Sequence, residues 1–261
     1  MPADLDTPGR TSSRDLLPWY VGLLLTAGLA WVVTITWATP MGAASGAMGL
    51  PLVAFLPVWV VMMAAMMFPS VAPMAIIWIR SVAGRATVRA RVWGIVSFLA
   101  GYLVAWLAFG VVVYLALVET DRLVRTTPAA APWVGAVVFG VAGAYQLSPL
   151  KGACLRHCRS PVGSLVHYAG FTGRTRDLRV GVHHGLYCVG CCWGLMILLV
   201  AVGAMNLPAM VALTGVVMVE KVWRHGATYS KYVGALLLAA AALAPFLPAL
   251  LPGLRPGPMS M

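Results

Sequence analysis

Long apolar runs constrain this chain more than any other feature of its sequence. A helix rises about 1.5 Å per residue, so about 20 apolar residues suffice to cross the hydrocarbon core of a bilayer. Runs of this kind alternate with polar segments and cover about residues 16–37, 52–79, 92–118, 131–147, 181–203, 207–219 and 232–251, of which the sixth is the shortest. The sequence therefore predicts an all-α fold, a bundle of seven transmembrane helices.

Composition agrees with a multi-pass membrane protein. The chain of 261 residues is 61% hydrophobic and only 10% charged, which is not expected of a soluble domain. We expect a disordered cytoplasmic N-terminus over 1–15, a single transmembrane domain over 16–251 with a basic cytoplasmic loop at 148–179, and a flexible tail over 252–261. No short apolar core precedes a small-residue cleavage site, so we interpret the first run as a retained helix rather than a signal peptide.

The basic residues predict the orientation of these helices. With the N-terminus in the cytoplasm, fifteen of the 18 lysines and arginines fall in the inner segments and three in the outer ones. This distribution follows the positive-inside rule and predicts N-in and C-out, in the cytoplasmic (inner) membrane of a bacterium. We expect membrane lipid to be the partner of this chain, whose net charge is +11. Nucleic acid is not an expected partner, because the chain has no basic, aromatic-interleaved soluble module.

The fifth run, residues 181–203, combines high apolarity with ligand-type side chains. Read as a helix, His184, Cys188 and Cys191 follow one another at i, i+4 and i+7 and therefore lie on one face, with Cys192 beside them. Four glycines in the same run form two small-xxx-small pairs, which allow neighbouring helices to approach closely. Polar ligand-type residues are costly inside a membrane helix, so their presence indicates a functional site.

Further ligand-type residues fall at a similar depth in the predicted bundle, towards its cytoplasmic half. They are Cys154, Cys158, His183, Glu220 and two i, i+4 methionine pairs, Met62/Met66 and Met63/Met67. Thiolates and thioethers select Cu(I), and thiolates also suit Zn(II). The sequence predicts a metal site formed by Cys188, Cys191, Cys192, Cys154, Cys158, His184, His183, Met62, Met63, Met66, Met67 and Glu220, with copper as the expected ion and zinc as the alternative.

Each of these residues also has a purely structural interpretation. A buried cysteine packs as a small hydrophobe, methionines fill gaps between helices, and histidines can lie at the headgroup boundary. Glu220 and Lys221 can extend to the interface from the end of a helix. His167 and His225 are expected in loops, without a ligand role.

Several segments together resemble an uncharacterised bacterial family of integral membrane proteins predicted to bind metal. The resemblance rests on M-M-x-x-M-M-x-P at 62–69, P-L-K-x-x-C-L-x-x-C-R-S-P at 149–161, C-x-G-C-C-W-x-L-M at 188–196, G-x-M-N at 203–206 and Glu220–Lys221, and it covers most of residues 55–225. It implies a membrane protein with a metal site and no particular reaction.

Three functions remain open from the sequence. The first is copper handling or delivery, in which the methionines relay Cu(I) to the cysteines. The second is an accessory or assembly subunit of a larger membrane complex such as a metalloenzyme, in which any bound metal is structural. The third is a thiol–disulfide relay between Cys188/Cys191 and Cys154/Cys158, which a reducing cytosolic side disfavours. The chain has no Walker sequence, no H-E-x-x-H and no G-x-S-x-G, so the sequence favours a protein that is not an enzyme.

Overall fold

Helices make up all of the regular structure that is described. The computed structural model describes residues 13–41, 46–82 and 87–254, so most of the predicted N-terminal segment and of the tail, with Arg10, Arg85 and Arg255, lies outside the described residues. The α-helices are α1 (Ser13–Met41), α2 (Leu52–Val82), α3 (Val88–Thr126), α4 (Ala131–Leu147), α5 (Pro149–Arg159), α6 (Pro161–Tyr168), α7 (Arg176–Met196), α8 (Leu198–Val202), α9 (Leu207–Val222) and α10 (Gly226–Leu243). Three short 3-10 turns, η1 (Pro128–Ala130), η2 (Pro248–Leu250) and η3 (Pro252–Leu254), complete the described chain. The predicted all-α fold is confirmed.

Five helical segments are long and apolar enough to cross a membrane, which indicates a membrane protein. They are Leu17–Ala38, Leu52–Ser81, Val88–Thr126, Pro128–Leu147 and Arg176–Val202, and they overlap the first five predicted spans. The third is longer at both ends than the predicted 92–118, because its helix continues through the charged residues up to Thr126. α9 covers the sixth predicted span, and α10 overlaps the seventh only over residues 232–243; the two helices have only 16 and 18 residues. The count of seven spans and their orientation therefore stay predictions.

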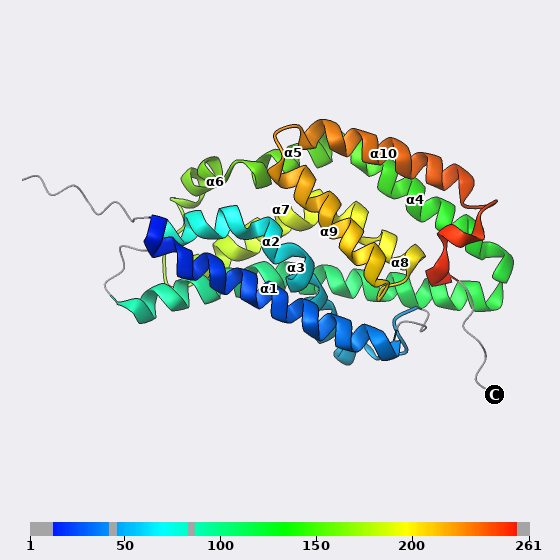
Figure 1. Ribbon diagram of the computed structural model, residues 1–261, viewed down its shortest axis with the longest axis horizontal. Coiled ribbons are helices and arrows are strands. Elements are labelled where there is room, and N and C mark those ends of the chain that lie inside the picture. The colour runs from blue at the N-terminus through cyan, green and yellow to red at the C-terminus, as the bar shows by residue number, and fades with distance from the viewer. Residues whose placement is uncertain (1–12, 42–45, 83–86, 255–261) are drawn as a thin grey trace, which may run out of the picture.

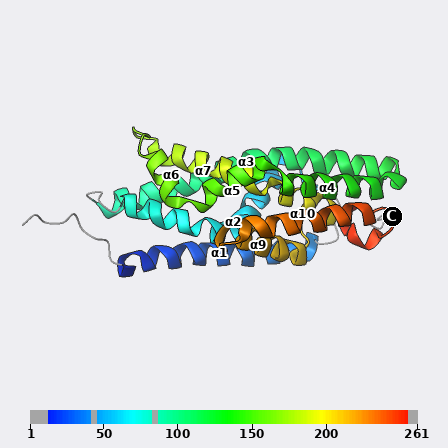
Figure 2. The same cartoon turned by 90° about the horizontal axis from the view of Figure 1, so that it is seen from above.

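The long helices pack side by side, with α2 in the interior. Figures 1 and 2 show most helices running roughly along one long axis, with the start of α1 at one end and the end of α10 at the other. α2 contacts α1, α3, α6 and α9, and the most extensive helix pairs are α3 with α7, α4 with α10 and α1 with α2. Large apolar side chains on the outer faces, such as Leu25 and Leu29 of α1, are exposed. Lipid is the solvent that suits such a surface.

Glycines bring α3 and α7 into backbone contact, as the small-xxx-small pattern predicts. A methyl group on Gly181 would overlap the carbonyl oxygen of Phe98, and one on Gly101 would overlap that of Leu178. A methyl group on Gly185 would lie 2.8 Å from Cβ of Ala105, closer than two carbon atoms can pack. This contact fixes the position of α7, which carries three of the five cysteines.

The segment predicted as a long basic loop, 148–179, contains the two short helices α5 and α6. Ser148 caps α5 by accepting a hydrogen bond from the backbone N–H of Lys151, and Pro149 occupies the first turn, where its missing N–H costs nothing. α5 packs against α7 and α9. The connection therefore returns to the bundle and contributes residues to its interior.

One contact bears on the topology of the second half of the chain. The guanidinium of Arg159, at the end of α5, donates hydrogen bonds to the carbonyls of Trp223 and Arg224 in the α9–α10 turn, at 2.8 and 2.9 Å. If only the five longer segments crossed the membrane, this turn and the end of α5 would lie on opposite sides. The contact favours a chain that crosses back through α9.

We expect Gly181→Ala to destabilise the bundle by about 1–3 kcal/mol, the cost of overpacking a tight interface, because the added methyl group meets backbone that cannot rotate away. Thermal unfolding in detergent, followed by circular dichroism, measures the change. Gly28→Ala in α1 is the matched control, since a methyl group there meets nothing within 4 Å. Equal melting temperatures for the two variants would contradict the proposed α3–α7 contact.

A reporter inserted at Arg224 should separate seven spans from five. Seven spans with the N-terminus inside place the α9–α10 turn in the cytoplasm, together with a reporter inserted in the α5–α6 segment. Five spans place the two reporters on opposite sides. Paired phosphatase and fluorescent-protein fusions at both positions measure this directly, and opposite signals would refute the seven-span topology.

Candidate metal centre

Three buried cysteines on α7 form the core of the candidate centre. The sulfur atoms of Cys188, Cys191 and Cys192, called here the thiol cluster, all lie within 4.8 Å of one another, and the side chains are at most 1% exposed. Thiolates bound to one ion at about 2.3 Å in tetrahedral geometry lie about 3.8 Å from each other. The thiol cluster can therefore hold one ion after small side-chain rotations.

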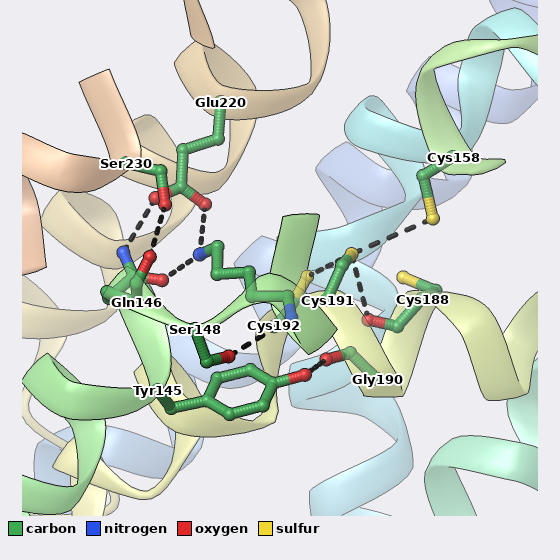
Figure 3. Close-up of polar contacts among 11 residues, drawn as sticks. Tyr145, Gln146, Ser148, Cys158, Cys188, Gly190, Cys191, Cys192, Glu220 and Ser230 are labelled. Atoms are coloured by element: carbon green, nitrogen blue, oxygen red, sulfur yellow. Dashed lines mark hydrogen bonds and ion pairs between the residues drawn. The ribbon is translucent and has the colours of Figure 1, made fainter. Parts of the chain in front are cut away.

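A fourth cysteine reaches the thiol cluster from α5. The sulfur of Cys158 lies 3.7 Å from that of Cys191, and the sulfurs of Cys191 and Cys192 are 3.2 Å apart. Figure 3 shows Cys158 extending toward Cys191 from its own helix. Cys154, one turn earlier on α5, packs close to Gly190 of α7 and lies outside the thiol cluster. All five cysteines are free thiols.

Two polar groups from other helices contact Cys188. The ammonium of Lys221 in α9 donates to the Cys188 sulfur at 3.0 Å and to the Ser70 hydroxyl of α2 at 3.2 Å. The hydroxyl of Tyr102 in α3 also lies 3.0 Å from the Cys188 sulfur. Lys221 is buried and points inward, so the interpretation of a lysine extending to the interface is wrong for this residue. Tyr102 and Ser70 were not predicted from the sequence, because neither belongs to a ligand motif.

Glu220 faces a different set of partners. One carboxylate oxygen accepts a hydrogen bond from the amide of Gln146 at 2.7 Å, and the other accepts from the ammonium of Lys151 at 2.7 Å. Lys151 also donates to the Gln146 side-chain oxygen, and Ser230 of α10 donates to the Gln146 carbonyl at 3.3 Å. Figure 3 shows Glu220, Gln146 and Ser230 together, apart from the sulfur atoms. The structure thus places Glu220 in a buried ion pair that joins α4, α5 and α9, and not among the thiols.

The two predicted histidines have different surroundings. His184 is 3% exposed, lies near the rings of Phe98 and Tyr102, and its Nδ1 has no hydrogen-bond partner among the described residues. His183 is half-buried, and its Nδ1 lies 3.3 Å from the hydroxyl of Tyr168 in α6. Both histidines were predicted to lie near the cysteines. Only His184 lies on the cysteine face of α7.

The four predicted methionines are completely buried in α2. They are Met62, Met63, Met66 and Met67. Ser70, one turn after Met66, donates to the Met67 carbonyl at 2.9 Å and accepts from Lys221, so α2 adjoins the thiol cluster at this turn. A relay along the methionines stays a prediction.

Burial shifts the pKa values of groups next to the centre on α5 and α6. It raises the pKa of the Cys154 thiol and of the Tyr168 hydroxyl. It lowers the pKa of the His157 imidazole, which the neighbouring His183 and His167 lower further. Neutral His157 is the form that can bind a metal ion.

Comparison with known proteins identifies a related family. A family model described as PpoB2, copper chaperone, matches residues 56–244, which include every cysteine and histidine discussed above. No curated protein and no solved structure matches the chain.

We expect Lys151→Met to destabilise the protein strongly, by about 3–5 kcal/mol, because the substitution leaves the Glu220 carboxylate buried without its counter-charge. The double variant Lys151→Met/Glu220→Met should recover most of this loss. Arg125→Met is the control, since it removes one partner of an exposed i, i+4 pair with Asp121 and should cost less than about 1 kcal/mol. Thermal unfolding in detergent measures all three, and a double variant less stable than Lys151→Met would show that the pair itself is not the source of the effect.

Proposed function

The chain belongs to the PpoB2 family of copper chaperones, and from this we propose that it binds Cu(I) at the thiol cluster and delivers it to a partner, from within the cytoplasmic membrane of a bacterium. The observation that carries the proposal is the grouping of three sulfur atoms within 4.8 Å in the dry interior of the helical bundle.

The chemistry of the thiol cluster suits a soft monovalent ion. Sulfur ligands select Cu(I), which two or three thiolates can bind without a water ligand. Cys188, Cys191 and Cys192 supply three sulfurs, and Cys158 adds a fourth from a separate helix. Cys158 is only half-buried, so rotation of its side chain can withdraw this ligand and leave the three sulfurs of α7 in place.

Lys221 supplies the positive charge that such a centre requires. Three thiolates and one Cu(I) carry a net charge of about −2, and a buried charge is costly unless it is paired. The Lys221 ammonium lies 3.0 Å from the Cys188 sulfur and compensates part of this charge. Cationic neighbours are typical of cysteines that act as thiolate ligands.

The methionines of α2 provide a weaker set of ligands next to the centre. Thioethers are neutral and bind Cu(I) individually with low affinity, which suits transient contacts. Met62 and Met66 repeat at i, i+4, as do Met63 and Met67, and the turn after them contacts Lys221 through Ser70. We assign these residues to movement of Cu(I) along α2 towards the thiol cluster.

Replacing the central thiols should remove bound copper. Cys188→Ser and Cys191→Ser keep the side-chain size and exchange a soft thiolate for a weak oxygen ligand. Loss of a residue that only supports a ligand costs 10–100-fold in metal affinity, so loss of a ligand itself should lower Cu(I) affinity by about 100-fold or more. Competition with a colorimetric Cu(I) chelator under anaerobic conditions measures the affinity in detergent.

Cys154→Ser is the matched control for this experiment, because it makes the same chemical change outside the thiol cluster. It should leave the affinity within a fewfold of the wild type. Stoichiometric, chelator-resistant copper in the double variant Cys188→Ser/Cys191→Ser would show that these thiols only pack the core, and the proposed function would lose its basis.

A further inference from the structure

A second group of ligand-type side chains lies beside the thiol cluster, on three helices. It consists of His157 from α5, His167 and Tyr168 from α6, and His183 from α7, and is called here the imidazole cluster. The ring centroids of His167 and His183 are 5.1 Å apart, those of His157 and His183 are 6.1 Å apart, and those of His157 and His167 are 6.4 Å apart. His167 was expected to lie in a loop without a role, and the structure instead stacks it on His183.

Two of these imidazoles converge on one hydroxyl group. Nε2 of His157 lies 3.0 Å from the Tyr168 hydroxyl, and Nδ1 of His183 lies 3.3 Å from the same oxygen. Tyr168 is fully buried, so this hydroxyl is a polar group in the interior of the protein. Ser164 adds a hydroxyl 3.3 Å from Nε2 of His157. Side-chain nitrogens from two helices thus already point to a shared position.

The spacing of the rings fits coordination of a single ion. A metal–nitrogen bond is about 2.0–2.1 Å, and three imidazoles around one tetrahedral ion then place their ring centroids about 5 Å apart. The observed separations of 5.1–6.4 Å approach this value. His167 is exposed, so its ring can rotate toward the other two at little cost.

His184 connects this group with the thiol cluster. Its ring centroid lies 6.2 Å from that of His157, and it precedes Cys188 by one helical turn on the same face of α7. It is 3% exposed and its Nδ1 has no hydrogen-bond partner among the residues that the structure describes. A buried polar nitrogen without a partner costs free energy, which indicates a ligand that binds there in another state of the protein.

We propose that the imidazole cluster is a second metal site, which binds a borderline divalent first-row cation through His157, His167 and His183 and lies between solvent and the buried thiol cluster. Imidazole nitrogen suits Cu(II), Zn(II) and Co(II), whereas the thiol cluster suits a softer ion. The exposed edge of His167 gives an ion in water access to this site, and the thiol cluster has no comparably exposed ligand among its three cysteines. This second site is inferred from the positions of the histidines and does not depend on copper binding at the thiol cluster.

Co(II) titration of the full chain in detergent, under anaerobic conditions, tests this site. The thiols are first saturated with Ag(I), a redox-inert ion of the same softness as Cu(I). Co(II) should then bind with a stoichiometry of one, and its spectrum should show visible d–d bands of a nitrogen-ligated tetrahedral ion without thiolate-to-cobalt charge-transfer bands. Charge-transfer bands would place the ion at free thiols and overturn the assignment.

Single substitutions in the imidazole cluster make the test specific. His157→Ala and His167→Ala should each weaken Co(II) binding at least about tenfold and leave Cu(I) affinity at the thiols unchanged within a fewfold. His225→Ala is the matched control, because His225 is an exposed histidine beside Trp223, outside the imidazole cluster. If His157→Ala fails to fold, His167→Ala alone tests the site, since the His167 side chain is at the surface and its loss should not affect folding. No saturable Co(II) binding, or an equal loss in His225→Ala, would refute the proposal, and the separate Cu(I) measurement shows independently whether the thiol centre exists.

Discussion

A buried ion pair fixes the relative positions of the helices around the centre. Lys151 and Glu220 are paired at 2.7 Å in the interior, and Gln146 binds the second carboxylate oxygen, so α4, α5 and α9 share one polar contact. Separating them would leave a lone charge in a region of low dielectric, at a cost of about 3–5 kcal/mol. Lys221 follows Glu220 directly in the chain, so the pairing of Glu220 also directs the Lys221 ammonium to Cys188.

The sequence predicted those features that depend on one helix alone. Lipid requires long apolar helices, so each of the first five apolar runs lies within or overlaps one of the five apolar segments of the described chain that are long enough to cross a membrane. Helical periodicity likewise places His184, Cys188 and Cys191 on one face whatever surrounds α7. The bounds of the seventh run were wrong: it was predicted at 232–251, whereas α10 covers Gly226–Leu243, because the polar residues before Tyr232 belong to the helix.

Which side chains meet across neighbouring helices could not be predicted from spacing. Glu220 and Lys221 are adjacent in the chain, yet the Glu220 carboxylate pairs with Lys151 and the Lys221 ammonium binds Cys188. Consecutive residues of a helix point in directions about 100° apart. The basic connection after α4 gave no sign that α5 and α6 fold back and bring His157 and His167 to His183. Such groupings depend on which helices are neighbours, and a single sequence does not specify this.

The two proposed sites differ in softness and in access, so they suit different ions. Nitrogen ligands at the imidazole cluster are borderline and partly exposed, whereas the thiol cluster is soft and buried. Cu(I) would therefore be held more tightly at the sulfurs than at any other described group of this chain. Its release requires ligands of equal softness, because nitrogen or oxygen donors cannot compete with three thiolates. If the protein delivers copper as proposed, its partner must accordingly present cysteine or several methionine ligands near Cys158 of α5, whose sulfur is less buried than those of the thiol cluster.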